Sequence, residues 1–367
     1  MYALKKIVIG NFRNIEFQEV DFSPNINCIS GGNGEGKTNL LDAIWYLSMT
    51  KSAFSPSDSA NFRYGTGEFA VSGTYTMPND ITSRFNIQVR EGDVKKVKRD
   101  DKAYSRVSEH IGVLPIVMVS PADTSMVSES GEERRKFVNS VLSQMDREYL
   151  SAAQQYNRYL MQRNRLLKTG MADQELLATF DARLSALATP IYQKRDAFCN
   201  RLVPVVQKYY KRISGGSEEV GIEYRSDLSN GNLADILASR LEKDRILKYT
   251  GAGVQRDDFI FTMNGHPIRR CGSQGQQKSF LVALKFAQYE IMKDAYGFPP
   301  ILLLDDLFDK LDMTRVANLL KMVADSEFGQ IFLTDSNKVR IEGIVNDLTS
   351  DRVFITAEGG VFRHHDD

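Results

Sequence analysis

One stretch of the sequence restricts the possible folds more than any other. Residues 31–38 fit the pattern G-x-x-x-x-G-K-[ST] and read Gly31-Gly32-Asn33-Gly34-Glu35-Gly36-Lys37-Thr38. Glycines let the backbone N–H groups point at phosphate oxygens, the lysine reaches the β- and γ-phosphates, and the threonine hydroxyl ligates Mg²⁺. We therefore predict that these residues and Asn39 bind ATP, and that Thr38 is also a ligand of Mg²⁺.

The residues on either side of this stretch have the pattern that a phosphate loop needs. Residues 25–30 read as a short strand, and helical spacing follows at Leu40, Leu41, Ile44, Trp45 and Leu47. A helix that starts at the loop adds its dipole to the anion site. The alternative is an ordinary glycine-rich turn, and the order strand–loop–helix favours the phosphate loop.

Composition excludes several classes of protein. Hydrophobic residues are 42% and charged residues 26% of 367, which is typical of a globular protein. No apolar run approaches the ~20 residues of a membrane span, and the start lacks a signal peptide. Three cysteines far apart in the sequence indicate a reduced, cytoplasmic protein. Equal numbers of cations and anions, 47 each, argue against a passive basic DNA-binding protein but allow local basic patches.

Hydrophobic patterning divides the chain into an α/β part and a helical part. Residues 1–130 and 250–367 alternate or carry buried-strand runs, such as 116–119, 301–304 and 330–334. Residues 131–249 are predicted to be helical, with a coiled-coil-like seam at Leu177, Phe180, Leu184, Leu187, Ile191, Phe198, Leu202, Val205 and Tyr209, and a polar step at Lys194 or Arg195. A partner stripe is expected within 147–168. Pro190 and Pro204 predict kinks or breaks in this seam.

Two carboxylates follow the apolar run 301–304. A buried parallel strand would bring Asp305 to its carboxyl edge, where it is suited to hold Mg²⁺, and Asp306 is suited to polarise the attacking water. Asp305 lies 268 positions after Lys37, far more than a compact phosphate-loop fold requires. The helical residues 131–249 are therefore predicted to be inserted in the nucleotide fold.

A third motif, Gly272-Ser273-Gln274-Gly275-Gln276-Gln277-Lys278, is a small-residue turn that opens a helix. A serine hydroxyl and N–H groups at a helix start form an anion site. Because Lys37 already serves the phosphates of its own subunit, we predict that Ser273, Gly275 and Gln276 contact the nucleotide of a second subunit.

These motifs, in this order and at this separation, resemble the ABC-type ATPases of the SMC class, and in particular its members in recombinational repair. The resemblance covers essentially the whole chain, and the further segments that carry it are 11–14, 120–123, 133–137, 162–168, 256–258 and Leu311-Asp312. It implies an α/β fold: an ABC-type phosphate-loop head with an antiparallel β subdomain, together with a discontinuous, coiled-coil-like helical lobe.

The resemblance also implies a function. Such proteins bind ATP with Mg²⁺, form an ATP-dependent homodimer, and bind double-stranded DNA at gaps and single/double-strand junctions. With two mediator proteins they promote loading of a strand-exchange protein, and slow ATP hydrolysis resets the clamp. Leu311-Asp312 would lie across the dimer interface. Thr334-Asp335 would sense the γ-phosphate, or would simply end a strand.

Three positions depart from the usual pattern. Gly253-Val254-Gln255 stands where these relatives show Gly-Pro-His, so that Gln255 would replace only the hydrogen bonding of the histidine. Residues 51–55 lack a common arginine, so that a positive contact to the nucleotide is either missing or supplied by Lys51. Asp306 stands where most ABC enzymes carry glutamate, a change shared by the repair members, and the shorter carboxylate predicts slow hydrolysis.

Basic clusters at 95–99 and at Arg158, Arg163, Arg165 and Lys168 are candidates for DNA phosphate contacts, or are merely solvated faces. Two other functions stay open. A transporter subunit would not need so large an insertion. A nuclease-associated ATPase of the SMC class would be expected to carry a metal-binding domain after the head, for which about 60 residues after Asp305 leave no room.

Overall fold

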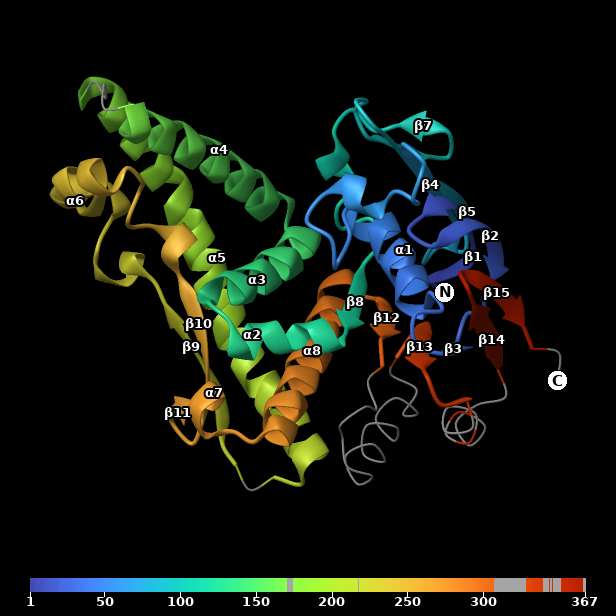
Figure 1. Ribbon diagram of the computed structural model, residues 1–367. Coiled ribbons are helices and arrows are strands. Elements are labelled where there is room, and N and C mark those ends of the chain that lie inside the picture. The colour runs from blue at the N-terminus through green and yellow to red at the C-terminus, as the bar shows by residue number, and fades with distance from the viewer. Residues whose placement is uncertain are drawn as a thin grey trace. The chain divides into compact units, whose positions relative to one another are not determined.

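The computed structural model describes residues 1–169, 174–216, 218–306, 328–338, 343, 345 and 351–365 (Figure 1). The chain forms two compact units. Unit 1 comprises Met1–Asp123, Arg212–Ser214 and Leu281–Asp367, and unit 2 comprises Thr124–Lys211 and Gly215–Phe280. In the part of the chain that is described, no helix has the length and apolarity needed to cross a membrane.

Unit 1 contains a largely parallel sheet of six strands in the order β15-β14-β3-β13-β12-β8. Its strands are β3 (Ile26–Ser30), β8 (Ile116–Val119), β12 (Ile301–Leu304), β13 (Ile331–Asp335), β14 (Arg352–Glu358) and the antiparallel edge strand β15 (Val361–His364). Strands β3, β8, β12 and β13 are buried throughout, as the apolar runs of β8 and β12 and the mainly apolar residues of β3 and β13 predict. Strand β3 lies between β13 and β14, so the residues that follow it leave the sheet at its centre.

A second sheet in unit 1 is antiparallel, in the order β2-β1-β4-β5-β6-β7. Its strands are β1 (Ala3–Phe12), β2 (Ile15–Asp21), β4 (Glu68–Thr76), β5 (Thr82–Arg90), β6 (Lys96–Arg99) and β7 (Lys102–Ala103). Helix α1 (Lys37–Met49) packs against strands of both sheets. Leu40, Leu41, Ile44 and Leu47 are fully buried there. At about 1.5–3 kcal/mol for each side chain, their burial holds α1 against these two sheets.

Unit 2 is mainly helical. Its elements are α2 (Ser125–Ser128), α3 (Gly131–Met145), α4 (Arg147–Thr169), most of α5 (Gln174–Ser214), α6 (Leu233–Leu247), α7 (Ile268–Cys271), the first turns of α8 (Gln274–Tyr296), and the sheet β11-β10-β9. The strands of that sheet are β9 (Val220–Arg225), β10 (Asp258–Met263) and β11 (His266–Pro267). Short 3₁₀ turns lie at Asp58–Asn61, Val107–Glu109, Pro121–Thr124, Asp227–Asn230 and Val254–Arg256.

Helix α5 corrects the predicted seam in two respects. The helix continues through Pro190 and Pro204, so neither proline breaks it. The polar step is Arg195, which is buried, whereas Lys194 is exposed. Of the predicted apolar positions, Leu177, Leu184, Ile191, Phe198, Leu202 and Tyr209 are buried, but Phe180, Leu187 and Val205 are only partly so.

Strand β9 lies within the residues that were predicted to be helical, and that prediction was wrong for 220–225. The strand pairs antiparallel with β10, which comes more than 30 residues later in the chain. Tyr224 of β9 stacks on Phe259 of β10, with ring centroids 4.7 Å apart. A strand of six residues depends on this distant partner, which local periodicity does not reveal.

Candidate nucleotide site

The loop between β3 and α1 has the backbone shape that its glycines predict. Gly34 and Gly36 adopt left-handed conformations, with φ of +87° and +105°. Lys37 is the first residue of α1, and its side chain is buried. The Lys37 ammonium donates to the carbonyl oxygens of Gly31 and Gly32, at 2.8 Å in each case. The cation therefore points back over the loop, where a phosphate group could replace these carbonyl oxygens as its partner.

Thr38 and Asp305, which lie 267 positions apart in the sequence, meet at this loop. The Thr38 hydroxyl donates to the Asp305 carboxylate, with oxygen–oxygen distances of 3.1 and 3.0 Å. Thr334 at the end of β13 donates to the same carboxylate at 2.7 Å. Burial raises the pKa of Asp305, while the bonds from Thr334 and Thr38 and the charge of Lys37 act in the opposite direction.

This pair fits the Mg²⁺ site that the sequence predicts. Mg²⁺ prefers oxygen ligands and in phosphate-transfer sites is usually held by one or two protein ligands with phosphate and water. The Thr38 hydroxyl and the buried Asp305 carboxylate supply two such oxygens. Among the described residues, no group of three or more His, Cys, Asp or Glu side chains could hold a metal by itself. A cation here would depend on the nucleotide for its remaining ligands.

Asp306, the predicted catalytic carboxylate, follows directly on β12 and is partly exposed. Its backbone is left-handed, with φ of +42°, and its N–H donates to the Thr334 hydroxyl at 3.0 Å. Thr334 thus links the two consecutive aspartates. Thr334 and Asp335 are both buried, and Thr334 already has two partners within the site. Leu311-Asp312, predicted to cross a dimer interface, lies outside the described residues.

Two residues before β2 support the loop, and sequence reasoning gave neither of them a role. The Arg13 guanidinium donates to Asn39 at 2.9 Å and to the buried Asp42 carboxylate of α1 at 2.5 Å. Asn14 accepts from Asn39 at 2.7 Å. Their signal in the sequence is the polar turn Arg13-Asn14 between two strands, where Arg13 takes a positive φ. Asn39, predicted to bind ATP, is thus positioned by this turn.

Arg13 also lies beside residues 51–55, the segment that lacks an arginine. Its guanidinium donates to the hydroxyls of Ser52 and Ser55, at 2.9 and 3.1 Å. A cation therefore already lies beside this segment, whereas Lys51, proposed as the substitute, is exposed.

The turn before α8 in unit 2 forms a capping box. The Ser273 hydroxyl accepts from the N–H of Gln276 at 3.3 Å, and the Gln276 side chain accepts from the N–H of Ser273 at 2.8 Å. Gln276 also donates to Glu218 at 2.6 Å. Ser273 is exposed and Gly275 partly so. The predicted second-subunit contacts thus lie together at the start of a helix with a fixed backbone.

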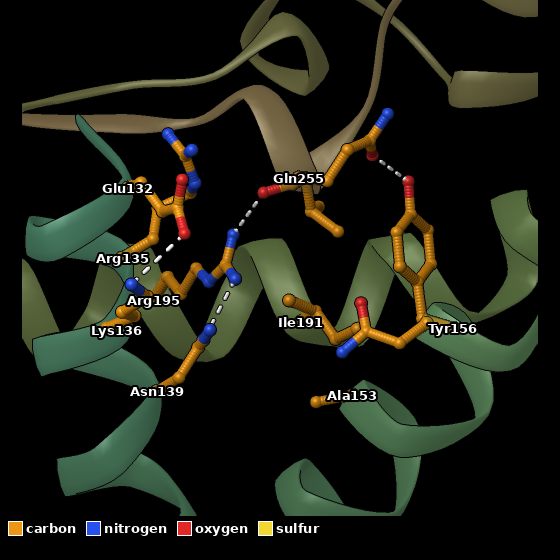
Figure 2. A pocket seen from close by; sticks show the side chains of 11 residues that line it. Glu132, Arg135, Lys136, Asn139, Ala153, Tyr156, Ile191, Arg195 and Gln255 are labelled. Carbon is orange, nitrogen blue, oxygen red and sulfur yellow. Dashed lines mark hydrogen bonds and ion pairs between the residues drawn. The ribbon is translucent and has the colours of Figure 1, made fainter. Parts of the chain in front are cut away.

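Gln255 borders a cavity of about 180 Å³ in unit 2, which also has Arg135, Lys136 and Arg195 in its walls (Figure 2). Gln255 accepts a hydrogen bond from Tyr156 and donates to the carbonyl of Ala252 at 2.7 Å. Its place in the structure is that of a hydrogen-bonding residue between α4 and the turn before β10, in keeping with the role predicted for it.

Both basic clusters need correction as DNA-binding candidates. Arg163 has no exposed surface. Its guanidinium binds Asp181 at 2.5 Å, Asp244 at 2.8 Å and Thr250 at 2.9 Å. Arg163 therefore holds α4, α5 and α6 together and cannot contact DNA in this fold. The other three members of the cluster, Arg158, Arg165 and Lys168, are exposed.

In the second cluster, only part of the side chains is open to solvent. Lys95 bonds to the carbonyl of Thr50 at 2.6 Å and pairs with Asp58 at 2.8 Å. Val97 is buried, Lys98 and Arg99 are partly buried, and Lys96 is exposed. Residues 95–99 therefore form a weaker candidate for a DNA contact than Arg158, Arg165 and Lys168, the exposed members of the first cluster.

Comparison with known proteins gives one consistent result. The model of the RecF/RecN/SMC N-terminal domain matches residues 3–350. The chain is 41% identical over 358 residues to the DNA replication and repair protein RecF of Bacteroides fragilis strain YCH46, covering 97% of each.

Solved structures agree. The chain is similar to the structure of the recombination mediator protein RecF-ATP in the RecFOR pathway, with a TM-score of 0.90, 28% identity and coverage of 100% and 98%. An Smc head domain from Pyrococcus furiosus, 14% identical and covering 100% of this chain and 96% of that one, has a TM-score of 0.57. The predicted fold, an SMC-class ATPase head with helical segments, is confirmed.

Proposed function

The chain belongs to the RecF family of SMC-class ATPases, and we propose that it is an ATP-dependent DNA clamp of recombinational repair and replication restart. The observation that carries this proposal is the meeting of Lys37, Thr38 and Asp305 at one edge of the parallel sheet. Lys37 would bind the β- and γ-phosphates, and Thr38 and Asp305 would hold Mg²⁺. A solved structure to which the chain is similar is that of RecF-ATP, which supports the same ligand here.

Residues Gly31, Gly32, Asn33, Gly34, Glu35 and Gly36 would surround the phosphates through their backbone. Ser273, Gly275 and Gln276 of a second copy would close over the γ-phosphate, because the N–H groups at the start of α8 form an anion site. The γ-phosphate then favours the closed homodimer, and the dimer opens when hydrolysis removes the γ-phosphate. Asp306 would orient the attacking water, and hydrolysis would be slow.

The proposed head comprises residues 1–130 and 250–367, with residues 131–249 as the inserted helical lobe. The dimer would bind double-stranded DNA, including gaps and single/double-strand junctions, through phosphate contacts that do not read sequence. It would act in the cytoplasm with RecR, in company with RecO, to promote loading of RecA on single-stranded DNA. The relatives named RecF, one of them in the RecFOR pathway, support these partners.

The proposal is tested by DNA binding with and without ATP. We expect binding of a short labelled duplex to require ATP and Mg²⁺, because a monomer whose 47 cations are balanced by 47 anions presents too little positive surface for tight binding. Two aligned copies would join their phosphate contacts, and with about six of them affinity should fall roughly a thousandfold between about 50 and 200 mM salt.

Lys37→Met is the control, since it removes the charge that reaches the phosphates. This variant should bind neither ATP nor DNA, although its melting temperature stays near that of the unmodified protein. DNA binding that is equally tight without ATP would contradict the clamp.

A further inference from the structure

The phosphate loop is in contact with the last hairpin of the chain. Strands β14 and β15 are joined by Gly359 and Gly360, and β14 lies next to β3, which leads into the loop (Figure 1). The N–H of Gly360 donates to the carbonyl of Glu35 at 2.9 Å. The N–H of Gly359 donates to the Glu35 carboxylate. Glu35 therefore accepts hydrogen bonds from both N–H groups of the hairpin turn.

The backbones of the loop and the hairpin approach each other closely. A Cβ atom on Gly31 would lie 2.4 Å from the carbonyl oxygen of Ala357 in β14. A Cβ on Gly36 would lie 2.9 Å from the Asn14 amide and 3.3 Å from Gly360. The distance at Gly31 is too short for a real contact and is to a backbone atom, so Gly31 is needed for close approach as well as for backbone shape, while a Cβ on Gly36 would be tight against Asn14 and Gly360.

Glu35 is an unexpected residue at this place, because a carboxylate in a phosphate loop repels the ligand. In the structure its side chain is bound to the hairpin N–H instead. The carboxylate is thereby held at the hairpin, and its bonds fix the segment between Gly34 and Gly36, whose N–H groups must face the phosphates.

We propose that Glu35 and the Gly359–Gly360 turn are positioning residues that hold the phosphate loop in its ligand-binding shape before ATP arrives. This inference rests on the proposed ATP binding. It makes a hairpin 324 positions away in the sequence part of the nucleotide site. A loop held in its bound shape loses less conformational freedom on binding, and so binds more tightly.

The test separates the hydrogen bond from the charge. Glu35→Ala removes the acceptor and should weaken ATP binding about tenfold, as loss of a bond to a charged group does. Glu35→Gln keeps an acceptor and removes the charge, so it should bind ATP at least as tightly as the unmodified protein. Glu358→Ala is the matched control, since Glu358 is an exposed carboxylate on the same hairpin and should change nothing.

The measurements are titration with a fluorescent ATP analogue, hydrolysis at saturating ATP, and thermal melting without nucleotide. For Glu35→Ala we expect weaker ATP binding at an unchanged saturated rate and melting temperature. Unaltered affinity in Glu35→Ala, or an equal loss in Glu35→Gln, would overturn the inference. If the unmodified protein itself bound no ATP, the proposed function would fail instead, which is a separate outcome.

Discussion

His110 is a buried histidine, and the folded protein favours its neutral form. The side chain has no exposed surface, one ring nitrogen bonds to the carbonyl of Leu47 at 2.6 Å, and the ring packs against Phe85 and Tyr104. Burial lowers its pKa from 6.5 to about 4. As the pH falls below 6.5, His110 binds a proton in the unfolded chain but stays neutral in the folded chain. The stability present above pH 6.5 is therefore lost progressively down to about pH 4, by roughly 3 kcal/mol in all.

The check is urea denaturation at several pH values. His110→Gln should remove most of this pH dependence, whereas His266→Gln, at an exposed histidine, should leave it intact. If His110→Gln and the unmodified protein lost the same free energy of unfolding between pH 6.5 and pH 4, groups other than His110 would cause the pH dependence.

Asp306→Asn addresses the proposed catalytic step. Asparagine keeps the size of the side chain but loses the charge that polarises water, so ATP should still bind while hydrolysis slows by about a hundredfold or more. The nucleotide-bound dimer should then persist for longer. Single-turnover hydrolysis measures this directly, and an unmodified rate would mean that Asp306 is not the catalytic carboxylate.

At the scale of residues, the sequence predicted the phosphate loop and the two aspartates after β12, because each motif is local. It did not predict the contacts that converge on them. Arg13 bonds to Asn39 and Asp42 at the start of α1, and the Gly359–Gly360 turn reaches Glu35 through the pairing of β14 with β3, contacts that span 26 to 324 positions of sequence. Arg163 was taken for a surface cation because polarity alone does not distinguish a solvated arginine from one paired with Asp181 and Asp244.

Among the elements, α4 offers a matched pair of predictions. Arg163→Met would leave the buried Asp244 carboxylate without its cation and should lower the free energy of unfolding by about 3–5 kcal/mol. Chemical denaturation measures this. If stability were unchanged, the ion pairs between α4, α5 and α6 would not hold these helices together.

Charge reversal of Arg158, Arg165 and Lys168, three exposed cations of α4, should leave stability almost unchanged. It should weaken binding to unrelated DNA duplexes alike and reduce the slope of affinity against salt by about three, one for each lost phosphate contact. DNA binding that survives this triple change would exclude this face of α4 and favour other surfaces.

The start of α8 carries the proposed contact with a second subunit. Ser273→Arg would place a long cation where the opposing phosphate must approach, so ATP should bind normally while dimerisation fails. Ser273→Thr keeps the hydroxyl of the capping box and should dimerise. Both variants are compared by light scattering with ATP. Normal dimerisation of Ser273→Arg would remove the turn from the interface.

Element by element, the apolar runs predicted the parallel strands because a strand buried on both faces needs no polar alternation. Strand β9 could not be predicted in this way, since its six residues are stabilised by β10. The breaks predicted at the two prolines of α5 do not occur, because the helix packs along an apolar seam. This packing compensates for a lost hydrogen bond that would end an isolated helix.

For the whole molecule, the order of the motifs was the most informative feature of the sequence. A phosphate loop and an aspartate-ended strand 268 positions apart required an insertion. The structure brings these motifs together in unit 1, while most of the intervening helices belong to unit 2. What the motifs do not determine is how two copies would meet, with the phosphate loop of one copy and the Ser273 turn of the other at a shared nucleotide.

Sedimentation velocity with and without ATP tests this central claim most directly. With ATP and Mg²⁺, we predict a species of twice the 41.4 kDa monomer mass, and without nucleotide the monomer. Lys37→Met should stay monomeric in both conditions. The same sedimentation coefficient with and without ATP would contradict the account.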